Sequence, residues 1–494
     1  MFPPFDEKRA YALCKKLIAD LDARRMTLTQ VTAVSEERAG NGLMLGVLVA
    51  NDSAGREIIL QAVSGLSRAL QKTSTAKDDN TGSSSARAEE ATPCVIVPPI
   101  VSAHARDKAL EAHDAEIHAL THRIQTLTQQ EASVAATAEK EARAQATGEA
   151  AASSAAHTSA AERKQLEALR ASLCRQSLAK VYNLYAFHCA DGAVRSLYSI
   201  CAERGIENPP TGTGDCCAPK LLDYAFSHQL TPLSMCEVYY GKQTPNKTSG
   251  AIYPPCDERC GIVLLAMLGL EILYRDEHII VVNKQSGVLS VPGRIEKDCI
   301  VNRVRRLFPA CIEQPSVHRL DMETSGLLVL AFTKEAHRAL SRQFEEGSVQ
   351  KQYVALVDGV LASRGVAAHG TMELYFRVDL NNRPHQMWDA VYGKKAITEW
   401  TIVRVETYYA PGEQKDVRGA GRPVTRVRFT PHTGRTHQLR LASADSHGFG
   451  CPIIGDTLYG TCAPGERLML HAESLSFTHP ATGERLHFTC KAPF

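Results

Sequence analysis

Short apolar runs in the C-terminal half of the chain predict buried strands. Residues 279–282 and 327–332 are continuous apolar runs of the length expected for such strands. Residues 334–346 contain good helix formers and are followed by Gly347, which predicts a helix that ends there. Because strands and helices are mixed without regular alternation, we expect an α+β domain over residues 269–494.

The first part of the chain shows weaker patterning. Residues 43–49 and 58–63 are strand candidates joined by a polar turn, so we expect a small α/β unit over residues 1–70. Residues 71–92 are polar and rich in Ser, Thr, Asp and Gly, which predicts a flexible linker, and we place this linker at residues 71–102.

Residues 103–180 are dominated by Ala, Glu, Gln, Lys and Arg, which predicts helix. Apolar residues recur there three or four positions apart, at Ile117, Leu120, Ile124 and Leu127. An Ala, Ser and Thr-rich segment over residues 147–161 interrupts the pattern. We therefore predict a coiled-coil-like arm of two antiparallel helices with a pliant tip, and a single long solvated helix is the alternative.

Residues 181–268 form a cysteine-rich accessory region. Its Gly212-x-Gly214 fragment lacks the strand and spacing of a dinucleotide fingerprint, so a nucleotide cofactor is not expected. A zinc site would require four ligands, and Cys256-x-x-x-Cys260 together with Cys216 and Cys217 is conceivable. We favour the alternative, in which these cysteines and Cys236 are isolated buried thiols.

Composition and charge limit the classes of protein. The chain has 494 residues, which predicts two or three domains. It contains no apolar run long enough to cross a bilayer and its charged N-terminus does not resemble a signal peptide, so we expect a cytoplasmic protein without a membrane partner. From residue 261 onward, 28 Lys and Arg face 24 Asp and Glu, a net charge of +4, whereas the rest has 28 against 30, or −2. The arginines at 303, 305, 306, 422, 426 and 428 are candidate phosphate contacts, and a solvated surface is the alternative.

One segment carries most of the chemical information. His318-Arg319-Leu320-Asp321 is followed by a Thr-Ser-Gly turn and then by the apolar run 327–332. A buried strand holds the preceding residues rigidly, so Asp321 is predicted to be a fixed carboxylate at the edge of a sheet. A turn-capping role for Asp321 beside Thr324 and Ser325 is the alternative.

The segment resembles the catalytic motif of the RluA-type pseudouridine synthases, which isomerise uridine to pseudouridine in ribosomal or transfer RNA. Further segments match the family in order and spacing, with Gln285 where proline is usual, and they lie at residues 281–287, 351–359, 433–440, 455–460 and 479–483. The resemblance covers about residues 269–494. It implies a pseudouridine synthase-like mixed central β-sheet with flanking helices and an RNA-binding cleft.

The resemblance also implies roles for individual residues. The reaction breaks the bond from ribose C1′ to base N1 and rejoins the base through C5. A carboxylate suits this reaction because it can attack the sugar or the base, or stabilise cationic sugar character. The family assigns that role to Asp321, with Arg440 as its ionic partner and Tyr353 against the base. No redox change occurs, so we expect no cofactor and no metal in this reaction.

The resemblance places the RNA-binding residues around this carboxylate. Arg319 is the candidate for flipping the target base, with an orienting salt bridge as its alternative role. Leu439 is a candidate apolar floor, although an ordinary core position would suit it equally. Residues Arg435, His437 and Gln438 of the same motif are placed at the RNA. We expect the imidazoles of His318, His437 and His471 to serve as hydrogen-bonding groups.

Other functions compete with an RNA isomerase. A glycosidase could use Asp321 and Glu323 as acid and base, and a non-catalytic RNA-binding protein or RNA chaperone could retain the fold. The target is expected to be a uridine in 23S rRNA or tRNA, because residues 382–387 and 393–396 resemble the family branch that modifies short stem-loops. Residues 1–268 could contribute to target positioning.

Overall fold

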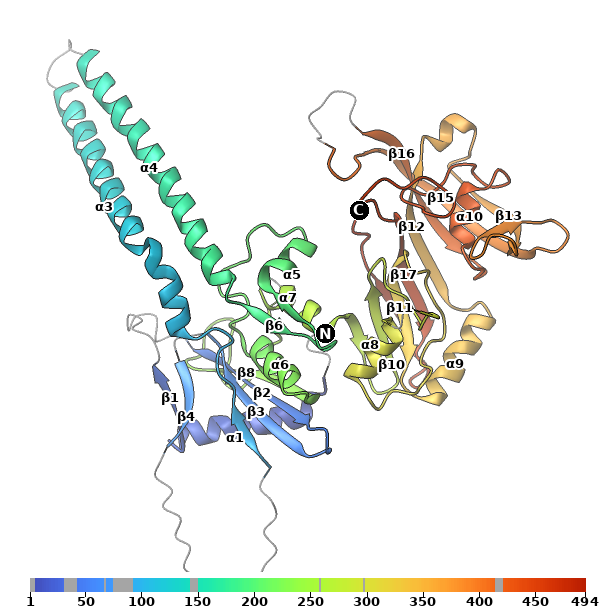
Figure 1. The fold of residues 1–494 in the computed structure, drawn as a ribbon, viewed down its shortest axis with the longest axis horizontal. Helices are drawn as coiled ribbons and strands as arrows, with labels where there is room; N and C mark the ends of the chain where they lie inside the picture. The colour runs from blue at the N-terminus through green and yellow to red at the C-terminus, as the bar shows by residue number, and fades with distance from the viewer. Residues whose placement is uncertain are drawn as a thin grey trace, which may run out of the picture. The chain divides into compact units, whose positions relative to one another are not determined.

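The computed structural model describes residues 5–30, 42–65, 68–73, 92–142, 150–256, 259–295, 298–413 and 421–494, with side chains described outside 134–160. These residues form two compact units, one over Phe5–Met267 and the other over Leu268–Phe494 (Figure 1). None of the helices in these ranges has the length and apolar character that a bilayer span requires.

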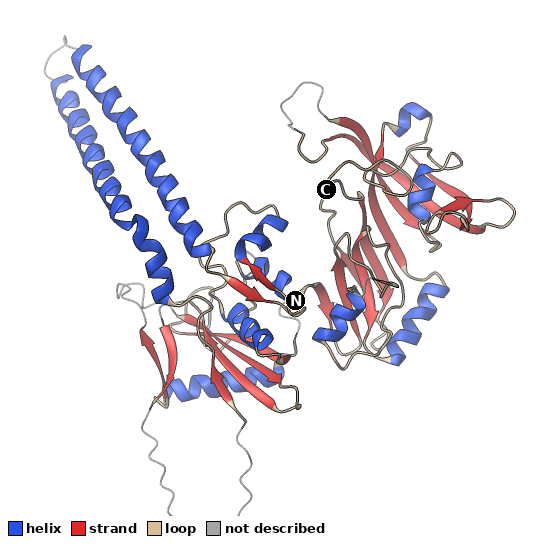
Figure 2. Cartoon of the chain, viewed as in Figure 1, coloured by secondary structure: helices blue, strands red, loops and turns tan. Residues whose placement is uncertain are grey.

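A mixed sheet dominates the C-terminal unit (Figure 2). Its strand order is β14-β13-β15-β16-β12-β17-β11-β10-β9, with β18 paired to β17. β11 and β17 are parallel, and the other neighbours are antiparallel. The strands are β9 (Glu271–Arg275), β10 (Ile279–Lys284), β11 (Ser325–Ala331), β12 (Gln350–Asp358), β13 (His369–Val378), β14 (Gln386–Trp388), β15 (Lys394–Tyr408), β16 (Arg422–Pro431), β17 (Leu470–Thr478) and β18 (Arg485–Thr489).

Strand β11 lies in the interior of this sheet, and every one of its residues is buried. Its apolar run packs with β10, β17 and helix α9 (Lys334–Glu345) in one core cluster. The Thr333 hydroxyl caps α9 by accepting a hydrogen bond from the Ala336 N–H. The predicted strands and the predicted helix are therefore confirmed, as is the α+β class of the domain.

A second core cluster lies under β12, β13, β15 and β16. It includes residues of the short helix α10 (Gln438–Ala444), and Tyr353 of β12 pairs with Phe429 of β16 beside it. Helix α8 (Ile300–Leu307) and the 3₁₀ turn Leu361–Arg364 complete the helical elements described in this unit. The segment before β11 is therefore attached to the core cluster that contains β11, and the segment before α10 is attached to the cluster that contains α10.

The N-terminal unit is built on a four-stranded sheet in the order β5-β3-β2-β8. β2 (Leu43–Asn51) pairs antiparallel with β8 (Thr231–Tyr240), so residues on both sides of the helical arm share one sheet. The other two strands of this sheet are β3 (Glu57–Val63) and β5 (Cys94–Ile96). Two separate two-stranded sheets pair β1 (Met26–Gln30) with β4 (Arg68–Lys72) and β6 (Ala186–His188) with β7 (Val194–Ser196). The helices include α1 (Lys8–Asp22), α5 (Leu197–Glu203), α6 (Cys217–Ser227) and α7 (Cys260–Leu268).

This pairing corrects the expected domain boundaries. Residues 1–70 and 181–268 were expected to be separate units, but the β2–β8 pair joins them. The expected linker 71–102 is also too long, because β4 extends to Lys72 and β5 pairs with β3 from Cys94. Its centre, residues 74–91, lies outside the described residues. Strand pairing between segments far apart in the sequence has no local signal, so the sequence pattern missed it.

The arm consists of α3 (Ala103–Ala142) and α4 (Ala150–Tyr182), which run side by side as two long helices (Figure 1). Ile124 and Leu127 are buried on α3, in agreement with the apolar spacing. Arg123 pairs with Glu162 at 2.9 Å and Arg163 pairs with Glu131 at 3.0 Å, so ion pairs also join the two helices. The predicted interruption over 147–161 is wrong for residues 150–161, which belong to α4, and residues 147–149 lie outside the described residues.

Candidate active site

Asp321 lies four residues before β11, in a turn that the main chain closes. The Thr324 N–H donates to the backbone carbonyl of Asp321 at 3.1 Å, so this turn does not use the carboxylate as a cap. The side chain remains 27% exposed, and its Oδ1 lies 4.0 Å from Nε2 of His437. The structure therefore presents this carboxylate at a surface opening while the strand behind it is fully buried.

Lys284 holds the turn that contains Asp321 through a hydrogen bond to the neighbouring Met322 carbonyl, and it was not predicted as a site residue. It is fully buried at the end of β10, and its Nζ donates to the carbonyls of Gln285 at 3.0 Å, Val288 at 2.7 Å and Met322 at 2.8 Å. Burial lowers the pKa of Lys284 to about 7, whereas the Asp321 carboxylate acts to raise it. Three carbonyl acceptors match the three N–H donors of an ammonium group.

Arg440 has a different ionic partner from the one predicted. Its Nε donates to Asp456 Oδ2 at 2.9 Å and its Nη2 to Asp456 Oδ1 at 2.6 Å, with both side chains buried. Nη2 also lies 3.0 Å from Glu323 Oε2. Asp321 contributes only a weaker Coulomb interaction that raises the pKa of Arg440, behind those of Asp456 and Glu323. The predicted direct Arg440–Asp321 pair is thus wrong for this structure, and the residue that holds Arg440 is Asp456.

His437 faces Asp321 from the residue before α10. Its backbone is left-handed, with φ of 55°, which turns the chain sharply from residues 433–436 into the helix. The Tyr459 hydroxyl lies 2.8 Å from Nδ1 and accepts the Gln386 N–H at 2.8 Å. That hydroxyl can donate its hydrogen to Nδ1, which leaves Nε2–H facing Asp321. Burial lowers the pKa of His437 and favours this neutral ring.

Gln438 lines the cavity and is held by four hydrogen bonds within the protein, and its contact with RNA stays a prediction. Its Nε2 donates to the Ile397 carbonyl at 3.1 Å and to the Thr398 hydroxyl at 2.9 Å. Its Oε1 accepts from the Thr433 hydroxyl at 2.8 Å and from the Arg435 N–H at 2.9 Å. All four positions of the amide are therefore occupied, and Gln438 holds the loop that carries Arg435.

The side chains of Asp321, His437, Gln438 and Arg440 lie on the lining of a cavity of about 740 Å³. Its lining brings together Asp321, Tyr353, Leu439, Arg319 and Arg440 from segments far apart in the sequence. The volume falls in the range of about 300–1,000 Å³ that is usual for small-molecule sites. Burial and then the Asp321 charge raise the pKa of Tyr353, so its neutral phenol is favoured.

Two predicted histidines serve as hydrogen-bonding groups near the cavity. His318 Nε2 accepts the Val329 N–H at 3.0 Å, and burial lowers its pKa to about 3. His471 lies 2.8 Å from the Ser325 hydroxyl through Nδ1 and 3.0 Å from the Cys490 carbonyl through Nε2. Burial lowers the pKa of His471 to about 4. Both rings are thus held neutral at pH 7.

Most of the candidate phosphate-binding arginines have other partners. Arg426 is buried and pairs with Glu406 at 2.6 Å, and Arg422 lies 3.3 Å from Glu466. Arg428 lies 3.8 Å from Glu473, and Arg303 pairs with Asp298 at 2.5 Å. Arg305 and Arg306 are exposed on α8. The three arginines of β16 have carboxylate neighbours from other strands and loops, so ion pairing within the protein also accounts for their alternation.

Comparison with known proteins identifies the family. The model of the RNA pseudouridylate synthase family matches residues 278–445. The dual-specificity RNA pseudouridine synthase RluA of Yersinia pestis is 43% identical over 228 residues, which cover 45% of this chain and 99% of that protein. The RluA protein of Escherichia coli K12 is 44% identical over 230 residues, covering 46% of this chain and 94% of that protein. The solved structure of human RNA pseudouridylate synthase domain containing 1 is 30% identical, with a TM-score of 0.37, and the match covers 46% of this chain and 84% of that one.

The chain belongs to the RNA pseudouridine synthase family, and within it to the RluA type. It is accordingly an isomerase, as the sequence motifs predicted. The glycosidase alternative is not supported, since Glu323 is held by Arg440 and by a 2.8 Å hydrogen bond from the Thr457 hydroxyl. More than half of this chain lies outside the matched length, so it is longer than these relatives.

Proposed function

We propose that Asp321 is the catalytic carboxylate that converts uridine to pseudouridine in this enzyme. Its position in the cavity carries the proposal, because Asp321 lines the cavity together with Tyr353 and Leu439. The other carboxylates on the cavity lining described in the structure are Glu345 and Glu346, which are exposed at the C-terminal end of α9. Asp321 is the one that precedes β11 and faces His437.

The surrounding groups divide the work of the reaction. The bond from C1′ to N1 breaks, the base turns, C1′ bonds to C5, and the hydrogen on C5 leaves as N1 gains one. Asp321 attacks the sugar or the base, or stabilises positive charge on the sugar. Tyr353 offers a flat ring and a neutral hydroxyl to the turning base, and buried Leu439 closes the apolar side.

Arg319 is proposed to hold the RNA from which the uridine is extruded. Its side chain is exposed on the cavity lining, two residues from Asp321. A planar guanidinium can fill the space left by a flipped base and thereby offset part of an unstacking cost of a few kcal/mol. Arg435 and Lys351 add positive charge on the same lining, where phosphates of the RNA would pass.

The relatives and one exposed loop support a proposal for the substrate class. We infer that this enzyme modifies a stem-loop uridine in 23S rRNA, tRNA or both, since the RluA relatives are named as dual-specificity enzymes. Tyr392, between β14 and β15, is 78% exposed and could stack on an unpaired base. Gln386 of β14, the strand before this loop, donates its N–H to Tyr459, which contacts His437. Such substrates would place the enzyme in the cytoplasm.

The N-terminal unit is proposed to contribute to target choice. The Yersinia pestis relative is matched over 99% of its length without a counterpart of this unit. The C-terminal unit alone should therefore retain the chemistry. If removal of residues 1–267 leaves the pattern of modified sites unchanged, the N-terminal unit has no part in target choice.

The deciding experiment is Asp321→Asn, which removes the carboxylate while keeping its volume. In cells lacking the gene, pseudouridines in total RNA are mapped by carbodiimide treatment and primer-extension stops. The wild-type gene should restore the lost stops, and D321N should restore none. Glu346→Gln makes the same chemical change elsewhere on the cavity lining, so it should restore them. Restoration by D321N would refute the proposal, and normal binding of RNA by D321N without isomerisation would exclude the chaperone alternative.

A further inference from the structure

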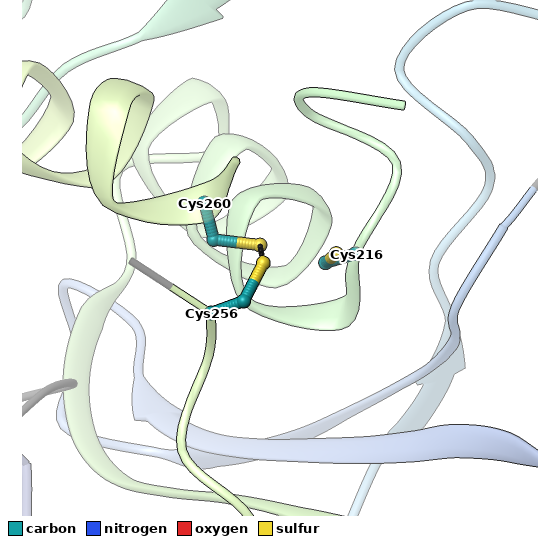
Figure 3. Close-up of side chains that lie close together, drawn as sticks. All are labelled: Cys216, Cys256 and Cys260. Atoms are coloured by element: carbon teal, nitrogen blue, oxygen red, sulfur yellow. Dashed lines mark hydrogen bonds between the residues drawn. The ribbon is translucent and has the colours of Figure 1, made fainter. Parts of the chain in front are cut away.

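Three cysteine side chains meet in the N-terminal unit. The sulfur atoms of Cys216, Cys256 and Cys260 all lie within 4.8 Å of one another, and Cys256 Sγ lies 3.8 Å from Cys260 Sγ (Figure 3). Cys216 immediately precedes α6, Cys260 is the first residue of α7, and Cys256 belongs to the loop before it. The expectation of isolated thiols is therefore wrong for these three residues. Cys217 was part of the conceivable zinc set but does not belong to this cluster, and its thiol donates to the Met44 carbonyl at 3.3 Å.

The sulfur separations fit a metal ion better than a disulfide. Zinc binds thiolate sulfur at about 2.3 Å in a tetrahedron, which places two bound sulfurs about 3.8 Å apart. The Cys256–Cys260 distance of 3.8 Å equals that edge, and the third sulfur is within 4.8 Å of both. A disulfide would need a sulfur–sulfur distance of about 2.05 Å and would leave the third thiol unused.

Two basic side chains, Lys220 and Arg259, lie close enough to Cys216 to interact with it electrostatically. The Lys220 ammonium is buried and fixed by the carbonyls of Val63 at 2.9 Å and Gly65 at 2.6 Å. Thiolates are the form in which cysteine binds a metal.

We propose that Cys216, Cys256 and Cys260 bind one zinc ion as thiolates. Cys256 is exposed while Cys260 is buried, so the site has one side open to solvent, where water would be the fourth ligand. The ion would tie the segment before α6 to the start of α7 and so stabilise the N-terminal unit. This site lies outside the isomerase cavity and needs no part in the proposed reaction.

Metal analysis of the full chain tests the proposal. The protein is purified without chelators, and metals are measured by inductively coupled plasma mass spectrometry. We expect about one zinc per chain, consistent with a single three-thiolate site. Cys256→Ser should lose the zinc, and because Cys256 is exposed the variant should still fold. Cys174→Ser, a half-buried cysteine on α4 outside the cluster, is the matched control and should keep it.

Cobalt substitution gives a second readout that does not depend on a variant. Co²⁺ added to the chelated full chain should produce a strong thiolate-to-cobalt charge-transfer band with tetrahedral visible bands, and Zn²⁺ should displace it. Absence of bound zinc together with a Cys256–Cys260 disulfide in peptide mass spectra would overturn the proposal. Iron in place of zinc, or full zinc retention by C256S, would overturn it as well. If C256S fails to fold by far-ultraviolet circular dichroism, the wild-type metal content and the cobalt spectrum decide.

Discussion

Asp456→Ala is expected to destabilise the C-terminal unit strongly, although Asp456 was not a predicted site residue. The Asp456 and Arg440 side chains are 0% and 3% exposed and form a two-point ion pair. Removing the carboxylate leaves a buried guanidinium with Glu323 as its remaining ionic partner, at 3.0 Å. Oδ1 of Asp456 also accepts the N–H groups of Leu458 at 2.9 Å and Tyr459 at 3.0 Å, which would lose that acceptor.

The magnitude follows from these contacts. Breaking a buried ion pair by removing one partner costs about 3–5 kcal/mol. Retained pairing of Arg440 with Glu323 places the electrostatic part at the lower end of that range, and the two unpaired N–H groups add about 1 kcal/mol or more. We therefore expect a loss of about 4–5 kcal/mol, against a total stability of about 5–15 kcal/mol for a typical protein.

Tryptophan fluorescence can isolate this unit within the full chain. Both tryptophans, Trp388 and Trp400, lie in the C-terminal unit, so urea unfolding followed at the indole emission reports that unit. Glu335→Ala is the control because its pair with Arg338 is 3.6 Å long and largely exposed, and it should not change the midpoint measurably.

A charge-free replacement separates the ion-pair argument from a volume effect. The double variant Asp456→Leu with Arg440→Met removes both buried charges, so it should unfold at higher urea than D456A. The reasoning is refuted if D456A loses less than about 1 kcal/mol, the range of an exposed pair. It is refuted as well if the double variant is the less stable of the two.

Three further outcomes are expected. Burial lowers the pKa of His471 to about 4 in the folded state, against about 6.5 in the unfolded state, so the unfolded state binds more protons. The free energy of unfolding should therefore fall by about 3 kcal/mol as the pH drops from about 6.5 to 4, and His471→Gln should flatten that dependence in urea titrations. Gly326→Ala should lower the free energy of unfolding by about 3 kcal/mol or more, because φ is +116° and a Cβ would lie 2.3 Å from the Ala472 carbonyl oxygen. Gly347→Ala, at φ +72° in open space, should lower it by about 1 kcal/mol, and equal unfolding midpoints for the two variants would contradict this. Arg319→Ala should lower pseudouridine formation at least tenfold, roughly the loss of one charge-assisted contact, without moving the unfolding midpoint, and a shifted midpoint would instead favour an orienting salt bridge.

Several parts of the candidate site could be predicted from the sequence because they are local. The apolar run of β11 and the motif before it determine where Asp321 lies along the chain and that a rigid strand follows it. The roles of Lys284 and Tyr459 were missed, although both lie inside segments that resemble the family. Lys284 has a local signal, since it is a lysine at the end of an apolar strand, where a charge is expected to need buried acceptors.

Contacts between distant segments had no such signal. Arg440 was expected at Asp321 and pairs with Asp456, and the hydrogen bond by which Gln438 holds the loop of Arg435 was not predicted. In the N-terminal unit, β2 pairs with β8 across the whole helical arm. Each of these outcomes depends on which segment occupies the neighbouring position in the folded chain.

The sequence by itself determined two central strands and one helix of the C-terminal domain, its family, and the position of Asp321, the proposed catalytic carboxylate. Hydrophobic periodicity and short motifs act over a few residues, so they can be recognised without a fold. The tertiary structure decided which charges pair, which amides are already satisfied and which thiols meet. These depend on distances of a few ångströms between residues far apart in the chain and on the exclusion of water, and only the packed molecule sets both.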